Sequence, residues 1–258
     1  MVGQRLQSMA SIPVQLPARC MISCCRRLPR VQLPLSMPSG ISARPLDRLP
    51  GFILPNGPSR TRNVGTVNKQ ERAAFARQAA DDLAAFLTAR ATELVPGGKL
   101  LIQVMGESST RCTGDGIYDA LNDAIIEICS SGRITKDQYE RYYQPLYFRT
   151  LGELVMPVSD ASSPLSSLYR LDRAETYEVK TPFVEEYRNA GDAAAFAQAF
   201  TNFFRAFTEP VLRIAFSSCI DIDALVTDIF SRAERLIREN PEAYMYHYVC
   251  VAALMTRL

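Results

Sequence analysis

The stretch that decides the fold is Glu93-Leu94-Val95-Pro96-Gly97-Gly98-Lys99-Leu100-Leu101-Ile102-Gln103. A proline followed by two glycines ends a helix, because proline lacks a backbone N–H and glycine readily adopts the left-handed conformation of a helix terminus. The apolar run from Leu100 to Met105 then has the right length for a strand covered on both faces. The stretch therefore predicts a helix, a break and a strand of an open α/β sheet.

Upstream of this break the sequence predicts one long amphipathic helix. Asn68 and Glu71 have the spacing of a capping box at its start. An apolar stripe then repeats at helical spacing: Phe75, Ala79, Leu83, Phe86, Leu87 and Leu94. Downstream of the strand, apolar residues repeat at helical spacing from Ile117 to Ile128, and Gly132 ends that second helix.

The rest of the chain alternates short helices and strands. Thr135 with Gln138 and Thr150 with Glu153 repeat the capping-box spacing. We expect a loop at 157–167, a strand at 168–179, helices at 193–207, 211–216 and 222–239, and a strand at 246–255 for which a helix remains the alternative. Asp221 and Asp223 are interpreted as the start of the helix at 222–239.

Residues 1–65 form an irregular, arginine- and proline-rich region, which we separate from a domain at 66–258. Nine prolines prevent any helix or central strand from extending through it. Residues 1–46 contain no acidic residue. Three interpretations stay open: a targeting peptide, a disordered tail, or a segment translated from a shifted reading frame, because lysine first appears at Lys69.

Charge and hydropathy exclude two classes of partner. Residues 1–70 hold ten basic residues and one acid, whereas residues 71–258 hold nineteen basic and twenty-six acidic residues. The acidic body is a poor candidate for binding nucleic acid. No run approaches the length of a membrane span, so we expect no membrane partner.

The seven cysteines are scattered and odd in number, which favours a reducing, cytoplasmic location over a disulfide framework. The cluster Cys20, Cys24 and Cys25 lacks the paired spacing of a zinc site. His247 is the only histidine, and no nucleophile motif accompanies it. We interpret it as a packing residue next to an apolar run.

The order of these parts resembles the C-terminal half of the SABATH methyltransferases, the plant-type family that methylates salicylate, benzoate, jasmonate and theobromine. The resemblance covers about residues 66–258. It rests on four segments in order: Phe86-Leu87-Thr88-Ala89-Arg90 through Glu93-Leu94-Val95-Pro96-Gly97-Gly98, Ser131-Gly132-Arg133-Ile134, Pro145-Leu146-Tyr147, and Arg205-Ala206-Phe207-Thr208-Glu209-Pro210.

This resemblance implies the late strands of a Rossmann-like methyltransferase sheet together with a helical cap. It also implies S-adenosylmethionine as cofactor and a small carboxylic acid as methyl acceptor. Carried over by position, Tyr147, Tyr118 and Phe204 are candidate acceptor-binding residues. An acceptor carboxylate is already ionised at neutral pH, so we expect no catalytic base.

Two departures from the family pattern matter. Some relatives bind magnesium through an Asp-x-Phe-Asn segment, but this chain reads Glu140-Arg141-Tyr142-Tyr143, and losing the asparagine oxygen predicts no metal. The acidic residue and glycine turn that recognise the cofactor have no counterpart in residues 1–65. Leu46 to Pro50 could be the tail of a family segment, but Arg44-Pro45 replace its His-Trp.

Two functions remain open from the sequence. The first is a methyltransferase forming methyl esters of small carboxylic acids, represented by a truncated chain with doubtful activity and cofactor binding of its own. The alternative is a non-catalytic α/β remnant or interaction module without S-adenosylmethionine. A half sheet would leave an exposed edge, so we expect aggregation or a partner such as a second copy.

Overall fold

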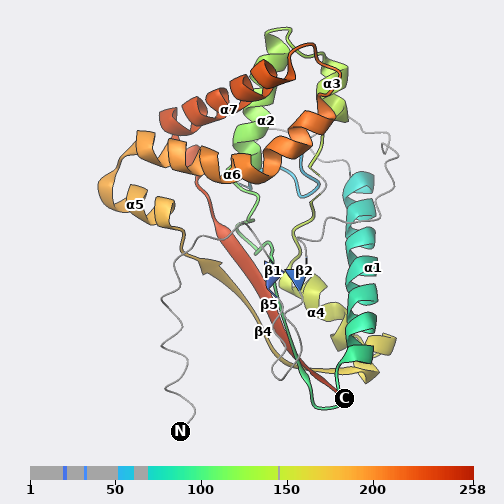
Figure 1. The fold of residues 1–258 in the computed structure, drawn as a ribbon. Helices are drawn as coiled ribbons and strands as arrows, with labels where there is room; N and C mark the ends of the chain where they lie inside the picture. The colour runs from blue at the N-terminus through green and yellow to red at the C-terminus, as the bar shows by residue number, and fades with distance from the viewer. Residues whose placement is uncertain (1–19, 22–31, 34–51, 61–68, 145) are drawn as a thin grey trace.

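A computed structural model of the chain describes residues 20–21, 32–33, 52–60, 69–144 and 146–258 (Figure 1). Its elements in chain order are β1 (Cys20–Met21), β2 (Gln32–Leu33), α1 (Lys69–Glu93), β3 (Lys99–Met105), α2 (Ile117–Ser130), α3 (Lys136–Arg141), α4 (Leu151–Ser159), η2 (Pro164–Ser167), β4 (Tyr169–Val179), α5 (Pro182–Ala190), α6 (Ala193–Ala215), α7 (Ile222–Glu239), η3 (Pro241–Tyr244) and β5 (Tyr248–Arg257). The predicted mixed α/β class with a helical cap is confirmed.

The main sheet has three strands in the order β3-β5-β4. The central strand β5 runs antiparallel to both neighbours, from Lys99↔Thr256 to Met105↔Cys250 on one side and from Tyr169↔Arg257 to Val179↔Tyr248 on the other. β3 and β4 are therefore parallel to each other, and their carboxyl ends lie at the same end of the sheet.

The predicted Pro-Gly-Gly break joins α1 to β3 as expected. Gly97 has a φ of 80°, a left-handed conformation that glycine adopts without a Cβ clash. Its N–H donates a hydrogen bond of 2.7 Å to the carbonyl of Arg257, and the N–H of Arg257 donates one of 2.8 Å to the carbonyl of Gly98. The break is thus tied to the last residue of β5.

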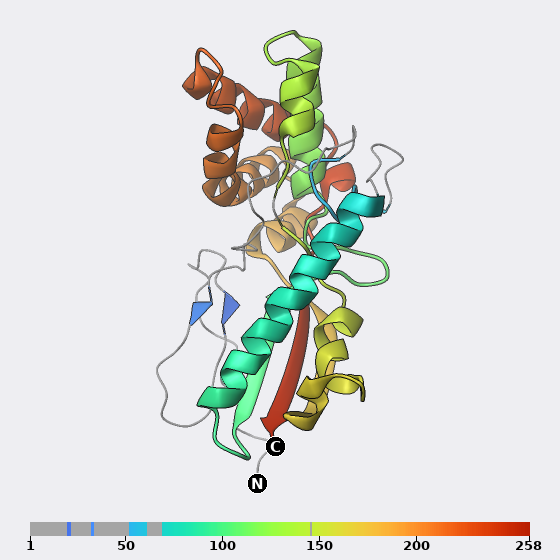
Figure 2. The ribbon, with the colours of Figure 1, turned by 90° about the vertical axis from the view of Figure 1, so that its right-hand side faces the viewer.

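Helices cover one face of this sheet. α1 lies along the sheet beside α4 (Figure 2), and their apolar side chains pack with Leu100, Ile102 and the inward residues of β5. On the opposite face Leu101, Gln103 and Met105 are only half-buried. The predicted strand is thus covered by helices on one face, whereas the other face is covered only in part, where β1 lies against β3.

A second hydrophobic core lies in the helical cap. Its largest contributions come from α2, α6 and α7, with Ile125, Phe204 and Ile229 all fully buried. Each such side chain adds roughly 1.5–3 kcal/mol of hydrophobic stabilisation. The cap helices lie at the end of the sheet where β4 ends and β5 begins (Figure 1).

Several predicted helix boundaries are confirmed by their caps. Thr135 and Thr150 each accept a hydrogen bond from the backbone N–H three residues on, and the Gln138 and Glu153 side chains complete both capping boxes. Asp221 caps α7 by accepting from the N–H of Ala224 at 3.0 Å. The cap predicted at Asn68 lies outside the described residues.

Three predictions of local structure need correction. The loop expected at 157–167 begins later, because α4 continues through Pro157 to Ser159. The two helices expected at 193–207 and 211–216 are one helix, α6, which contains Pro210. Fully buried Phe204 and Leu212 flank that proline on the inner face of α6. Their packing outweighs the tendency of proline to end a helix. The helix α5 was not predicted.

Part of the proline-rich N-terminal region packs into the cap. Phe52, Ile53 and Leu54 are each at most 2% exposed, and the carbonyl of Ile53 accepts from the N–H of Gln144 at 2.7 Å. Residues Cys20–Met21 and Gln32–Leu33 form a short antiparallel pair. The other residues of 1–51, and the domain boundary predicted at 65, lie outside the described residues.

Candidate functional site

The carboxyl ends of β3 and β4 are the place to search for a ligand site. In open α/β sheets, ligands bind outside the carboxyl ends of the parallel strands. β3 leads directly into Gly106 and Glu107, and Gly106 forms a parallel bridge with Arg149. The segment that contains Tyr147 therefore reaches this end of the sheet.

Glu107 is the buried centre of a polar cluster at this end. Its side chain accepts from Nδ2 of Asn56 at 3.1 Å and pairs with Nη2 of Arg72 at 3.2 Å. Asn56 also exchanges two hydrogen bonds with the backbone of Phe148, at 2.9 and 3.0 Å. Burial raises the pKa of Glu107 although Asn56 and Arg72 oppose the shift. The cluster joins four segments that are distant in the chain, at Asn56, Arg72, Glu107 and Phe148.

Tyr147 lies beside this cluster, half-buried. Its hydroxyl donates to Oε1 of Glu153 at 2.6 Å, and the other oxygen of Glu153 accepts from the backbone N–H of Thr150 at 2.8 Å. Burial and the hydrogen bond to Glu153 raise the pKa of Tyr147 above its ordinary range, while Arg72 acts in the opposite direction. Pro145, which precedes it in the family segment, lies outside the described residues.

Tyr118 and Phe204 lie together in the core of the cap. Tyr118 is 1% exposed and Phe204 is fully buried. Burial raises the pKa of the Tyr118 hydroxyl well above its ordinary value, and Tyr246 is among the side chains that add to the shift. The ring of Phe200 lies 5.3 Å from that of Phe204 and 5.4 Å from that of Tyr246. Tyr118, Phe204 and Tyr246 therefore belong to the same hydrophobic core.

The structure therefore brings Tyr118 and Phe204 into one cluster and leaves Tyr147 outside it. Tyr147 stands among charged side chains at the end of the sheet, whereas its neighbours Leu146 and Phe148 belong to the cap core. Phe148 and Tyr118 both approach Gly114, where an added Cβ would lie 2.8 and 3.2 Å from their rings. The acceptor-binding role of all three stays a prediction.

An acidic group at the start of α2 was not found from the sequence. Asp115 accepts from the N–H of Cys112 at 2.8 Å, and Asp119 accepts from the N–H of Ser59 at 3.3 Å. Burial, with the charges of Asp119 and Glu107, raises the pKa of Asp115 to about 6. Asp115 lies in the turn before α2 and Asp119 in its first turn, so no spacing rule of a single helix connects the two acids.

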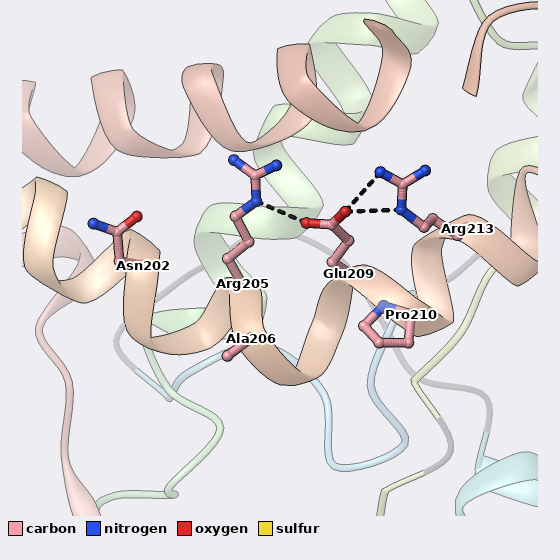
Figure 3. A pocket seen from close by; sticks show the side chains of 6 residues that line it. All are labelled: Asn202, Arg205, Ala206, Glu209, Pro210 and Arg213. Atoms are coloured by element: carbon pink, nitrogen blue, oxygen red, sulfur yellow. Dashed lines mark hydrogen bonds and ion pairs between the residues drawn. The ribbon is translucent and has the colours of Figure 1, made fainter. Parts of the chain in front are cut away.

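A shallow surface hollow of about 450 Å³ lies along α6 (Figure 3). Figure 3 shows Glu209 between two arginines, and it bonds to Arg205 and to Arg213, both at 2.7 Å. Arg205 also lies 5.0 Å over the ring of Phe230, and Arg213 pairs with Asp223 at 2.7 Å. These guanidinium groups already have partners, so the hollow is a helix surface and offers no evident ligand chemistry.

The glycines that follow β3 leave no room beside them for S-adenosylmethionine. A nucleoside cofactor would need glycines after a strand that let its ribose approach the backbone. Gly106 and Gly114 follow β3, but a Cβ on Gly106 would lie 2.5 Å from the carbonyl of Arg149, and one on Gly114 would lie 2.8 Å from Leu54. The chain's own atoms occupy the space beside these glycines.

Metal and thiol chemistry add no second site. Within the described ranges, no group of three or more His, Cys, Asp or Glu side chains could hold a metal ion. Tyr142, in the segment that binds magnesium in some relatives, is 1% exposed and packs on Phe216. Cys112, Cys129, Cys219 and Cys250 are free thiols. None of the helices in the described part is long and apolar enough to cross a membrane.

Comparison with known proteins gives a consistent result. The chain is 29% identical over 144 residues to a probable caffeine synthase 2 of Camellia sinensis, which covers 55% of this chain and 37% of that protein. It is 25% identical over 185 residues to a jasmonate O-methyltransferase of Arabidopsis thaliana, covering 67% of this chain and 45% of that protein. The chain thus spans less than half the length of these relatives.

A solved structure of another protein has a similar fold. The structure of a loganic acid methyltransferase with SAH matches with a TM-score of 0.55 at 19% identity, covering 72% of this chain and 49% of that one. The model of the SAM dependent carboxyl methyltransferase family matches residues 60–258. Because that match covers most of the chain, the resemblance expected from the sequence is confirmed: the chain belongs to the S-adenosylmethionine-dependent carboxyl methyltransferase, or SABATH, family.

Proposed function

We propose that this chain supplies the acceptor-binding part of an S-adenosylmethionine-dependent methyltransferase that forms methyl esters of small carboxylic acids. The observation that carries the proposal is the family match across residues 60–258. The relatives named as a jasmonate O-methyltransferase and a loganic acid methyltransferase support a small carboxylic acid as acceptor.

The proposed role of the chain is binding and orientation. A carboxylic acid is ionised at neutral pH, so its oxygen needs no general base before it accepts a methyl group. Holding that oxygen in line in a dry site lowers the entropic part of the barrier. Tyr118 and Phe204 would form an apolar wall in the cap, and Tyr147 would border it at the end of the sheet.

We further propose that the chain alone has little or no methyltransferase activity. The described residues offer no cofactor cradle, because their own atoms fill the space beside Gly106 and Gly114. The cofactor, when bound, supplies the methyl group, and residues outside the described part would have to hold most of it. A homodimer, a cytoplasmic location and the absence of a nucleic-acid partner complete the proposal.

The second candidate is a non-catalytic α/β module that has lost the cofactor. The observation in its favour is the occupied space at the β3–α2 turn, where Gly114 contacts Leu54 and Phe148. Such a module would keep the cap fold and bind neither S-adenosylmethionine nor an acid.

Isothermal titration calorimetry of the full chain with S-adenosylmethionine separates the two candidates. Binding in the micromolar range, about −8 kcal/mol, supports the methyltransferase. Titration with adenosine alone is the matched control, since it lacks the sulfonium and amino acid parts. Transfer of a labelled methyl group to benzoate or jasmonate is measured in parallel. No heat and no labelled ester, from a chain whose thermal unfolding is cooperative, would favour the module.

A further inference from the structure

Three ionisable side chains from three separate segments meet at the carboxyl end of β4. Arg111 lies in the loop after β3, Glu178 is the next-to-last residue of β4, and His247 directly precedes β5. Nδ1 of His247 lies 2.8 Å from Oε1 of Glu178, and Nη1 of Arg111 lies 2.7 Å from Oε2 of the same carboxylate. Both oxygens of Glu178 are therefore engaged.

This arrangement fixes the imidazole of His247. Its side chain is only 14% exposed. Burial raises the pKa of Glu178, but hydrogen bonds from His247 and Arg111 outweigh it and hold that pKa below its ordinary value, so the carboxylate stays charged. A carboxylate on one ring nitrogen selects the tautomer and fixes the orientation of the ring. In the part of the chain that the structure describes, Nε2 of His247 has no hydrogen-bond partner.

Backbone hydrogen bonds also hold His247 at the proposed ligand end of the sheet. The carbonyl of His247 accepts from the N–H of Val249 at 3.2 Å, and the carbonyl of Val249 accepts from the N–H of Gly106 at 3.0 Å. His247 therefore precedes β5, the strand that pairs with β3, and Glu107 follows β3 at the same end of the sheet. Tyr246 and Tyr248 flank it along the chain, with ring centroids 6.3 Å apart.

Other cations at this end are already engaged. Arg72 pairs with Glu107, and the guanidinium of Arg149 donates to the carbonyl of Ala79. A carboxylate ligand needs a positively charged or N–H donor, and the imidazolium form of His247 offers one at Nε2. Among the described residues, the carboxylate of Glu178 on β4 contacts this ring, and Arg111 in the loop contacts the same carboxylate.

We propose that His247 binds the carboxylate of a small organic acid through Nε2, with Glu178 and Arg111 as positioning residues that hold the ring. The inference rests on the proposed function, because it names the group that recognises the acceptor. The anion binds the protonated imidazole, so we expect binding to weaken at alkaline pH.

The test uses the full chain and benzoate, with benzamide as the uncharged control of the same shape. Because His247 is the only histidine, its imidazole gives one assignable NMR signal. Benzoate should shift that signal and bind about tenfold more tightly near about pH 5.5 than near about pH 8.5. Benzamide should do neither.

Two variants and a control refine the test. His247→Gln should abolish the pH dependence of benzoate binding, and Glu178→Gln should weaken binding at low pH because the ring loses its charged partner. Glu186→Gln, an exposed carboxylate on α5, should change neither. Benzoate that binds equally at both pH values without shifting the His247 signal overturns the inference and leaves the proposed function standing. Absence of any benzoate binding also overturns it, while the calorimetry with S-adenosylmethionine decides the proposed function separately.

Discussion

The hydroxyl of Tyr147 and the carboxylate of Glu153 form a hydrogen bond of 2.6 Å. The same carboxylate accepts from the backbone N–H of Thr150 at 2.8 Å and so completes the capping box of α4. One side chain therefore both starts a helix that covers the sheet and orients a candidate acceptor-binding residue. Local helix chemistry and the proposed site are coupled at this point.

This coupling predicts unequal effects for two substitutions. Glu153→Ala removes the cap and the tyrosine partner together, and we expect a loss of about 2 kcal/mol in the free energy of unfolding. Tyr147→Phe removes one hydrogen bond, and we expect a loss of about 1 kcal/mol. Urea unfolding measures both, with Glu186→Ala on α5 as the exposed control. Equal losses for the two variants would contradict the shared role of Glu153.

Two glycines with similar positive φ angles give a second prediction. Gly116 has a φ of 77° and Gly132 a φ of 76°. A Cβ on Gly116 would lie 2.5 Å from the carbonyl oxygen of Tyr244, whereas a Cβ on Gly132 would meet nothing within 4 Å. We expect Gly132→Ala to cost about 1 kcal/mol from backbone strain alone, and Gly116→Ala to cost about 3 kcal/mol or more.

Thermal unfolding of the two alanine variants provides the comparison. Gly132→Ala is the control for a positive φ without the overlap. If both variants lose the same stability, the close approach of α2 to η3 does not constrain the fold.

Packing gives a third prediction, which concerns Phe204. It is fully buried, with the rings of Phe200 and Phe230 at 5.3 and 6.0 Å. Phe204→Ala should cost about 3–5 kcal/mol if neighbouring side chains fill the space around it, and Phe204→Met should cost less than about 1.5 kcal/mol. Half-buried Phe207→Ala is the comparison on the same helix. A loss below about 1 kcal/mol for Phe204→Ala would instead indicate an open pocket at this position.

Much of the architecture was predictable because its signals are local. The start of α7 follows from Asp221, the start of α3 from Thr135, and the α1–β3 junction from Pro96 and Gly97. Each signal acts within four residues of the feature that it specifies. Tertiary packing did not need to be known for these elements.

The polar site was not predictable for the opposite reason. Glu107 gains its partners from Asn56 and Arg72, which are 51 and 35 residues away in the chain. The pairing of His247 with Glu178 spans 69 residues. No spacing rule connects such positions, so the sequence indicated His247 as a packing residue and missed its charged partner. Continuity of α6 through Pro210 likewise depends on packing.

The last prediction concerns pH and Asp115. Burial raises its pKa in the folded chain to about 6, above the ordinary value of 3.8, so the folded chain binds a proton more tightly than the unfolded chain. The contribution of Asp115 to stability must therefore fall as pH rises from about 4 to about 6, by at most about 1.4 kcal/mol per pH unit. The raised pKa of Glu107 adds to the same trend.

Unfolding in urea at pH values across this window measures the slope of stability against pH. Asp115→Asn keeps an acceptor for the N–H of Cys112 and should make the slope of stability against pH less negative. Asp223→Asn, on an exposed turn of α7, should leave that slope unchanged. Equal slopes for the native chain and Asp115→Asn would show that burial does not dominate at Asp115.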